Sequence, residues 1–292
     1  MVNMNYTGIE WTNKYPKQKI LRKEIQAEVD AAMEIVFKTF GKKNIKGIYF
    51  KGSASKLWDS IIDYVQEFSD IDIHVLFQDD DLMSKKIGKV ADALKFGKEI
   101  EAAFFRRIKK PQYLPRLQLL SLNDMHKKDF FLPSPKDIVH TIYGVDYVSR
   151  SVSSEENISH ALSGLYEHEK FVGNFAHKVM DSNHTALAKD LRDLFWRISS
   201  LGNNTLVLLG LSFDEAWARN RTSVVAELKT LGRYKLAEQY ISFYKYSWDY
   251  VLTKDADSVR KAMIVGHEFI GECISFAKKY ETSRNSKKKS AT

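Results

Sequence analysis

One stretch, residues 69–77, constrains the fold more than any other part of the chain. Its sequence, SDIDIHVLF, alternates polar and apolar residues as far as Val75. Side chains two residues apart on a strand point to the same face of a sheet. Asp70 and Asp72 would therefore project together from one face while the isoleucines beside them enter a core. The stretch predicts a half-buried strand.

The chemistry of this strand follows from its two carboxylates. Held this close, they repel each other unless a cation lies between them. Mg²⁺ suits such a pair, because it prefers one or two carboxylates together with substrate phosphates. Upstream, a short apolar strand runs into Gly52 and Ser53, a small turn whose backbone N–H groups and hydroxyl suit a phosphate. These residues together predict metal-assisted transfer of a nucleotide.

Hydrophobic periodicity predicts the other elements. Helices are expected at residues 17–40, 57–68 and 83–107. Strands are expected at residues 45–50, 69–77, 116–122 and 138–148, the last with a short helix as the alternative. From residue 153 onward only helical spacing remains, and Ser212 with Glu215 matches a capping box.

These patterns divide the chain into three parts. We expect an α/β (α+β) domain at residues 1–150, an all-α helical bundle at residues 151–281 and a basic flexible tail at residues 282–292. The tail contributes to the net charge of +8, which mildly favours anionic partners. The same charge argues against a polycationic substrate.

Composition gives the broad class of the protein. With 292 residues and 44% hydrophobic content, the chain can bury a substantial core. The first residues lack the order of a signal peptide, and no run approaches the roughly 18 apolar residues of a membrane span. The single cysteine, Cys273, cannot form an internal disulfide and lies in an apolar run. We expect a cytoplasmic protein with no membrane partner.

The order of these motifs resembles a known superfamily. A strand, the Gly-Ser turn, a helix and then a strand that begins Ser-Asp-Ile-Asp resemble the polymerase-beta-like nucleotidyltransferases. The added helical part is similar to the antibiotic nucleotidyltransferase branch, which includes aminoglycoside and lincosamide enzymes. The resemblance implies a mixed sheet, a nucleoside triphosphate (NTP) substrate and two Mg²⁺ ions. The residues it implies are Gly52, Ser53 and Ser69 for the nucleotide, and Asp70 and Asp72 as catalytic metal ligands.

The chain departs from that pattern in the length of one interval. Fifteen residues separate Ser53 from Ser69, which is longer than usual for such enzymes. An extra helical turn before the second strand, within the helix expected at residues 57–68, would absorb the difference.

A second departure concerns a third carboxylate, which the superfamily usually places on a neighbouring strand as a base or metal ligand. The corresponding strand is residues 116–122, where the natural position holds Gln118. An amide is neither a base near neutral pH nor an anionic ligand. Asp124 would substitute if the strand extends that far, and Asp146 and Glu101 are remoter alternatives.

The leading hypothesis is a Mg²⁺-dependent nucleotidyltransferase that moves a nucleoside monophosphate from an NTP to a hydroxyl acceptor. The net charge fits a small neutral or anionic acceptor, a protein hydroxyl or an RNA end better than an aminoglycoside. The sequence identifies neither the acceptor nor the preferred base.

Two other hypotheses remain open. Gln118 motivates the first, a catalytically degenerate member of the same fold that serves as a nucleotide-binding or interaction module. The second is a nucleic-acid-binding protein that uses the basic helix at residues 83–107. Acidic residues interleave with the basic ones along that helix, so an ordinary solvated surface is favoured over a nucleic-acid partner.

Overall fold

The computed structural model describes residues 9–128 and 131–290, which form two compact units. The α/β unit comprises residues 12–57 and 66–150. The helical unit comprises residues from 151 onward together with two earlier pieces, residues 9–11 and 58–65. The chain therefore passes between the units four times.

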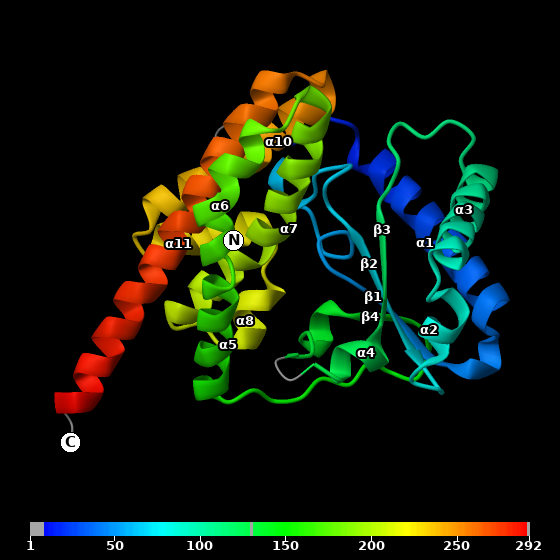
Figure 1. Ribbon diagram of the computed structural model, residues 1–292, viewed down its shortest axis with the longest axis horizontal. Coiled ribbons are helices and arrows are strands. Elements are labelled where there is room, and N and C mark those ends of the chain that lie inside the picture. Colours follow the sequence, from blue (N-terminus) through cyan, green and yellow to red (C-terminus); the bar gives the residue numbers. More distant parts are fainter. Residues whose placement is uncertain (1–8, 129–130, 291–292) are drawn as a thin grey trace. The chain divides into compact units, whose positions relative to one another are not determined.

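A mixed sheet forms the centre of the α/β unit (Figure 1). Its strands within the described residues are β1 (Ile45–Lys51), β2 (Ile71–Phe77), β3 (Leu117–Ser121) and β4 (His140–Gly144), in the order β3-β2-β1-β4. β1 is antiparallel to β2 and β4, whereas β2 and β3 are parallel. The expected mixed sheet is confirmed, as is a strand rather than a helix near residue 140.

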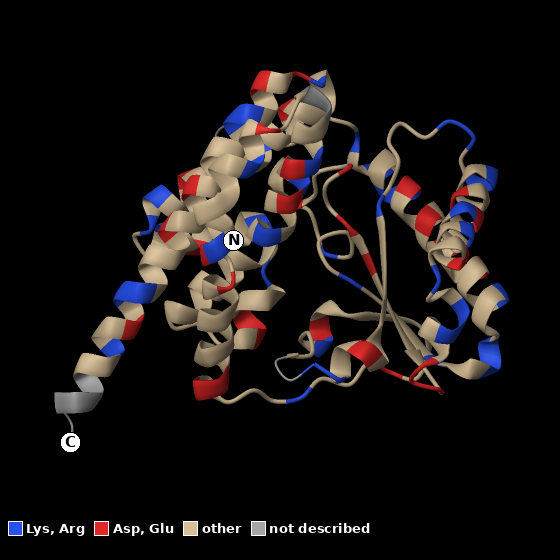
Figure 2. Ribbon diagram, in the orientation of Figure 1, with Lys and Arg blue, Asp and Glu red and all other residues tan. Residues whose placement is uncertain are grey.

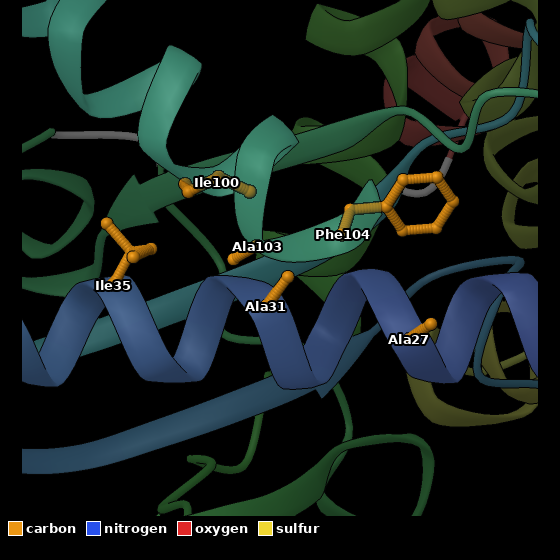
Figure 3. Packing of buried hydrophobic residues seen from close by; sticks show 6 residues of the cluster. All are labelled: Ala27, Ala31, Ile35, Ile100, Ala103 and Phe104. Carbon is orange, nitrogen blue, oxygen red and sulfur yellow. The ribbon is translucent and has the colours of Figure 1, made fainter. Parts of the chain in front are cut away.

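Two helices pack against each other beside the sheet, α1 (Gln18–Phe40) and α3 (Val90–Arg107). Their contact is made by a cluster of small and branched side chains (Figure 3). The cluster consists of Ala27, Ala31, Ile35, Ile100, Ala103 and Phe104. Alanines at the centre of the contact let the two helices approach closely, and larger residues fill the space at its ends.

The region after β2 differs from the expected single helix at residues 83–107. A short helix, α2 (Leu82–Ile87), ends at Gly88, whose N–H donates to the carbonyl oxygen of Ser84, and α3 begins two residues later. Another short helix, α4 (Leu122–His126), directly follows β3.

The two faces of β2 have different surroundings, as the alternation predicts. Ile71, Ile73 and Val75 are fully or almost fully buried, whereas Asp72 is partly exposed. Phe77, on the isoleucine face, contacts Phe40 at the end of α1, so this face is the one covered by helices. The face that carries Asp72 is covered toward its other end by a cluster that includes Tyr49 of β1 and Leu122 of α4.

The helix expected at residues 57–68 is absent from the structure. The described chain there contains only a short 3-10 helix, Ile61–Asp63, and residues 58–65 pack within the helical unit. Trp58 stacks on Tyr64, and Trp248 donates from its Nε1 atom to the carbonyl oxygen of Ile61 at 2.6 Å. The long interval between Ser53 and Ser69 is therefore an excursion of the chain and not an added helical turn.

A buried carboxylate fixes this excursion. Asp63 accepts hydrogen bonds from the backbone N–H groups of Asp59 and Ser60, at 2.7 and 3.0 Å. It also accepts from the backbone N–H and the hydroxyl of Thr222, at 2.7 and 2.8 Å. Arg221 donates to the carbonyl oxygen of Ile62 at 3.0 Å. The segment therefore depends on residues far along the chain for its conformation.

The rest of the helical unit is a bundle. Its helices within the described residues are α5 (Ser154–Tyr166), α6 (Glu169–Met180), α7 (His184–Leu208), α8 (Phe213–Ala218), α9 (Arg221–Thr230), α10 (Tyr234–Thr253) and α11 (Ala256–Ser290). Ser212 and Glu215 form the expected capping box. Cys273 is fully buried, and burial raises the pKa of its thiol to about 12.

Residues 282–290, which the sequence analysis assigned to a basic tail, continue α11. Tyr166 of α5 donates to the Glu281 carboxylate at 2.9 Å, and Arg284 pairs with Glu155. Side-chain contacts therefore hold this part of α11 against α5. Residues 291–292 lie outside the described residues.

Among the helices of the described chain, none combines the length and the apolar character needed to cross a bilayer.

The contact between Asp63 and α9 predicts a specific loss of stability. Thr222→Val should lower the free energy of unfolding by about 1–3 kcal/mol, because it leaves a buried carboxylate without one of its donors. Urea denaturation followed by tryptophan fluorescence would measure the change. Thr230→Val removes an exposed hydroxyl from the same helix and should cost less than about 0.5 kcal/mol. Equal effects of the two substitutions would contradict this account.

Glu28 of α1 predicts an unusual pH dependence. Burial, and secondarily the charge of Glu101, raise its pKa from 4.5 to about 7. Between these values the folded protein keeps the proton while the unfolded chain loses it, so raising the pH favours unfolding. The free energy of unfolding, measured by urea denaturation at several pH values from 4.5 to 7, should fall by up to about 3 kcal/mol because of this group. Glu28→Gln should remove that component, and an unchanged slope in the variant would contradict the assignment.

Candidate functional site

Asp72 lies near the start of β2, on the sheet face opposite α1 and α3, and Asp70 directly precedes that strand. Asp72 pairs across the sheet with Lys51 of β1 on one side and with Gln118 of β3 on the other. Residues paired on adjacent strands point to the same face. Lys51, Asp72 and Gln118 therefore form one row across three strands.

The Gly-Ser turn lies directly against this row. Gly52 follows β1 with a φ of +82°, and its carbonyl oxygen accepts a hydrogen bond from the N–H of Ser55 at 3.2 Å. A Cβ atom on Gly52 would lie 1.8 Å from Oδ2 of Asp72. Only glycine can therefore combine this backbone conformation with this close approach. The structure brings together Gly52 and Asp72, as the sequence analysis expected.

Asp70 lies just before β2, next to a residue that the sequence analysis did not identify. Its Oδ1 is 2.7 Å from Nε of Arg116, and its side chain is only 14% exposed. The Ile71 N–H donates to the carbonyl oxygen of Arg116 at 2.7 Å, which aligns Arg116 with Asp70. The available signal was spacing, because Arg116 is two residues before Gln118 and so shares its face.

Lys51 adds a second basic side chain to the site. Its Nζ donates to the hydroxyl of Ser134 at 2.9 Å. Burial lowers the pKa of Lys51, and the charge of Asp72 acts in the opposite direction. The site therefore contains two carboxylates and two basic side chains, each carboxylate with one of them as neighbour.

His74 lies one step further along the same face and pairs with Tyr49. Burial, followed by the charges of Lys51 and His126, lowers the pKa of its imidazole to about 3. At neutral pH His74 is therefore an uncharged, buried side chain beneath the site.

Asp124 does not join the two aspartates. β3 ends at Ser121, which pairs with Val75, and Asp124 follows in α4. Its side chain is 54% exposed and lies 3.6 Å from Nζ of Lys127. The strand extension that would have made Asp124 the third carboxylate does not occur, because Ser121 caps α4 and begins a helix there.

The remoter alternatives also lie elsewhere in the α/β unit. Asp146 follows the end of β4, where Gly144 pairs with Gly47, far along β1 from Lys51. Glu101 belongs to α3, and its charge acts on Glu28 of α1. Gln118 therefore remains the residue that faces Asp72 from β3.

The acidic residues at the start of β2 were considered as metal ligands in the sequence analysis, and they are few in number. Within residues 9–128 and 131–290, no group of three or more His, Cys, Asp or Glu side chains is arranged to hold a metal ion. Mg²⁺ binds through few carboxylates plus substrate phosphates, and the two aspartates of this motif are ligands of that chemical type. Ser53 follows Gly52 in the turn, and Ser69 directly precedes Asp70. Both serines belong to the α/β unit.

Comparison of the chain with protein-family models, with curated proteins and with solved structures yields no significant match. The chemistry and geometry of the residues described above are therefore the basis for a functional assignment.

Gly52 provides a direct test of the site's geometry. Gly52→Ala should lower the thermal denaturation midpoint, because it adds strain of roughly 1–3 kcal/mol at a positive φ and displaces the Asp72 carboxylate. Gly97→Ala is the matched control, since a Cβ at Gly97 in α3 meets nothing within 4 Å. That substitution should leave the midpoint unchanged or raise it slightly. A midpoint unaffected by Gly52→Ala would contradict the close approach to Asp72.

Proposed function

We propose that the protein is a Mg²⁺-dependent nucleotidyltransferase, which moves a nucleoside monophosphate from an NTP to a hydroxyl acceptor. The observation that carries the proposal is the contact between the two motifs. The Gly52 turn passes against the carboxylate of Asp72, and Asp70 directly precedes the same strand. This closeness supports the proposal that the turn binds phosphate beside the metal-binding aspartates.

Each residue has a role in this proposal. The turn at Gly52 and Ser53 offers backbone N–H groups and a hydroxyl to the triphosphate, and Ser69 lies beside the second motif. Asp70 and Asp72 would hold the metal ion. When bound, Mg²⁺ supplies charge neutralisation at the transferred phosphate and the leaving pyrophosphate.

Transfer to a hydroxyl acceptor also needs a base that removes the acceptor's proton, and the site has few side chains that could act as that base. Gln118 faces Asp72 where a third carboxylate would be expected, and an amide does not accept a proton near neutral pH. This observation favours a second candidate function, a nucleotide-binding module that has lost catalysis.

A nucleic-acid partner is supported less well by the charges. Basic and acidic residues interleave along α3 (Figure 2). Arg107 is 2.8 Å from the Glu34 carboxylate, and Lys85 is 2.8 Å from the carboxylate of Asp79. Such ion pairs are typical of a solvated helical surface.

Two measurements separate transferase from binding module. Thermal-shift titrations with ATP, GTP, CTP and UTP, each with and without Mg²⁺, would identify the nucleotide. Pyrophosphate release across a panel of neutral and anionic hydroxyl acceptors would then test turnover. Release requires the transferase, whereas Mg²⁺-dependent binding without release across the panel supports the binding module.

The aspartates give the mutational test. Asp70→Asn and Asp72→Asn should each abolish Mg²⁺-dependent nucleotide binding, because they remove the anionic ligands while keeping side-chain volume. Isothermal titration calorimetry would measure the affinity, and circular dichroism would verify the fold. Asp79→Asn, an exposed aspartate of the same unit that pairs with Lys85, should bind like the parent protein. Full nucleotide affinity in both site variants would refute the proposed function.

A further inference from the structure

The charges around the carboxylate pair differ from those of a centre built for two divalent ions. Asp70 has the Arg116 guanidinium at 2.7 Å, and Asp72 has Lys51 as its partner on β1. On the β3 side Asp72 faces the neutral amide of Gln118. Each carboxylate of the motif therefore has a basic side chain of the protein as a neighbour, Arg116 beside Asp70 and Lys51 beside Asp72.

Arg116 is built into this arrangement. Its carbonyl oxygen accepts the Ile71 N–H, and the next residue, Leu117, enters the ladder opposite Ile71. The backbone thus keeps Arg116 alongside Asp70. The carboxylate has an exposed fraction of only 14%, so its ion pair is screened less than a surface pair.

We infer that Arg116 is a positioning residue that neutralises Asp70, so that the site binds one divalent cation, and binds it together with the triphosphate. Without the nucleotide, a divalent ion would meet an Asp70 carboxylate already paired with Arg116, and the guanidinium would repel the ion. The phosphates supply the missing negative charge and further oxygen ligands. The inference rests on the proposed function for the identity of the nucleotide, and its claim about the metal-only state is independent of it.

The experiment uses Mn²⁺ as a probe for Mg²⁺ and detects bound Mn²⁺ by electron paramagnetic resonance on the full chain. In the absence of nucleotide, Arg116→Gln should bind Mn²⁺ at least tenfold more tightly than the parent protein. Arg116→Lys, which keeps the charge, should restore weak binding. Lys85→Gln, which removes a cation paired with Asp79 elsewhere in the unit, should bind Mn²⁺ as weakly as the parent.

A second measurement needs no variant. With the α,β-methylene analogues of ATP, GTP, CTP and UTP, tested one at a time, the parent protein should take up one Mn²⁺ per chain at saturation. Two ions per chain, with or without an analogue, would overturn the inference and leave the proposed function standing. Mn²⁺ affinities of the parent and Arg116→Gln within twofold of each other would also overturn it. Failure of all four analogues to bind would count against the proposed function, while the metal-only comparison would still decide the role of Arg116.

Discussion

The pairing of β2 with a strand on each side is the constraint on which the candidate site depends. Hydrogen bonds to β1 and β3 fix which side chains flank Asp72, and the same register sets Arg116 next to Asp70. A shift of one residue would turn Asp72 toward the helices and expose Ile71 and Ile73. The burial of those isoleucines therefore determines the register, and through it the composition of the site.

Core and site consequently share one strand but use opposite faces. On the core face, Phe77 meets Phe40, and the helices α1 and α3 hold each other through the alanines of Figure 3. On the other face, the turn at Gly52 presses against a carboxylate at a backbone conformation suited to glycine alone. Stability gained on the first face supports a close and charged arrangement on the second.

Much of the α/β unit could be predicted because its signals are local. The alternation in β2 and the helical periodicity of α1 are patterns within a single element. Gln118 was expected beside the aspartates from the superfamily resemblance, and the register of β2 and β3 pairs it with Asp72. The end of β3 could not be predicted from the sequence, because Ser121 suits a strand and a helix cap equally well.

The segment at residues 58–65 shows the limit of local signals. Its apolar residues, such as Ile61 and Ile62, have the same spacing whether they form a helix or an irregular chain that packs on a distant partner. The deciding contacts are made with Thr222, 159 residues beyond Asp63. The ion pair of Arg116 with Asp70 was missed for a similar reason, because it exists only once the strands are paired.

The excursion also bears on how such a protein can be divided. A cut at residue 150 looks natural, yet the resulting C-terminal fragment would lack the segment that satisfies the donors of Arg221 and Thr222. The N-terminal fragment would carry the buried carboxylate of Asp63 without its partners on α9. The two units are therefore not modular: neither could be exchanged with an unrelated domain by recombination at one point, because residues 58–65 belong to the helical unit although they lie within the sequence of the α/β unit.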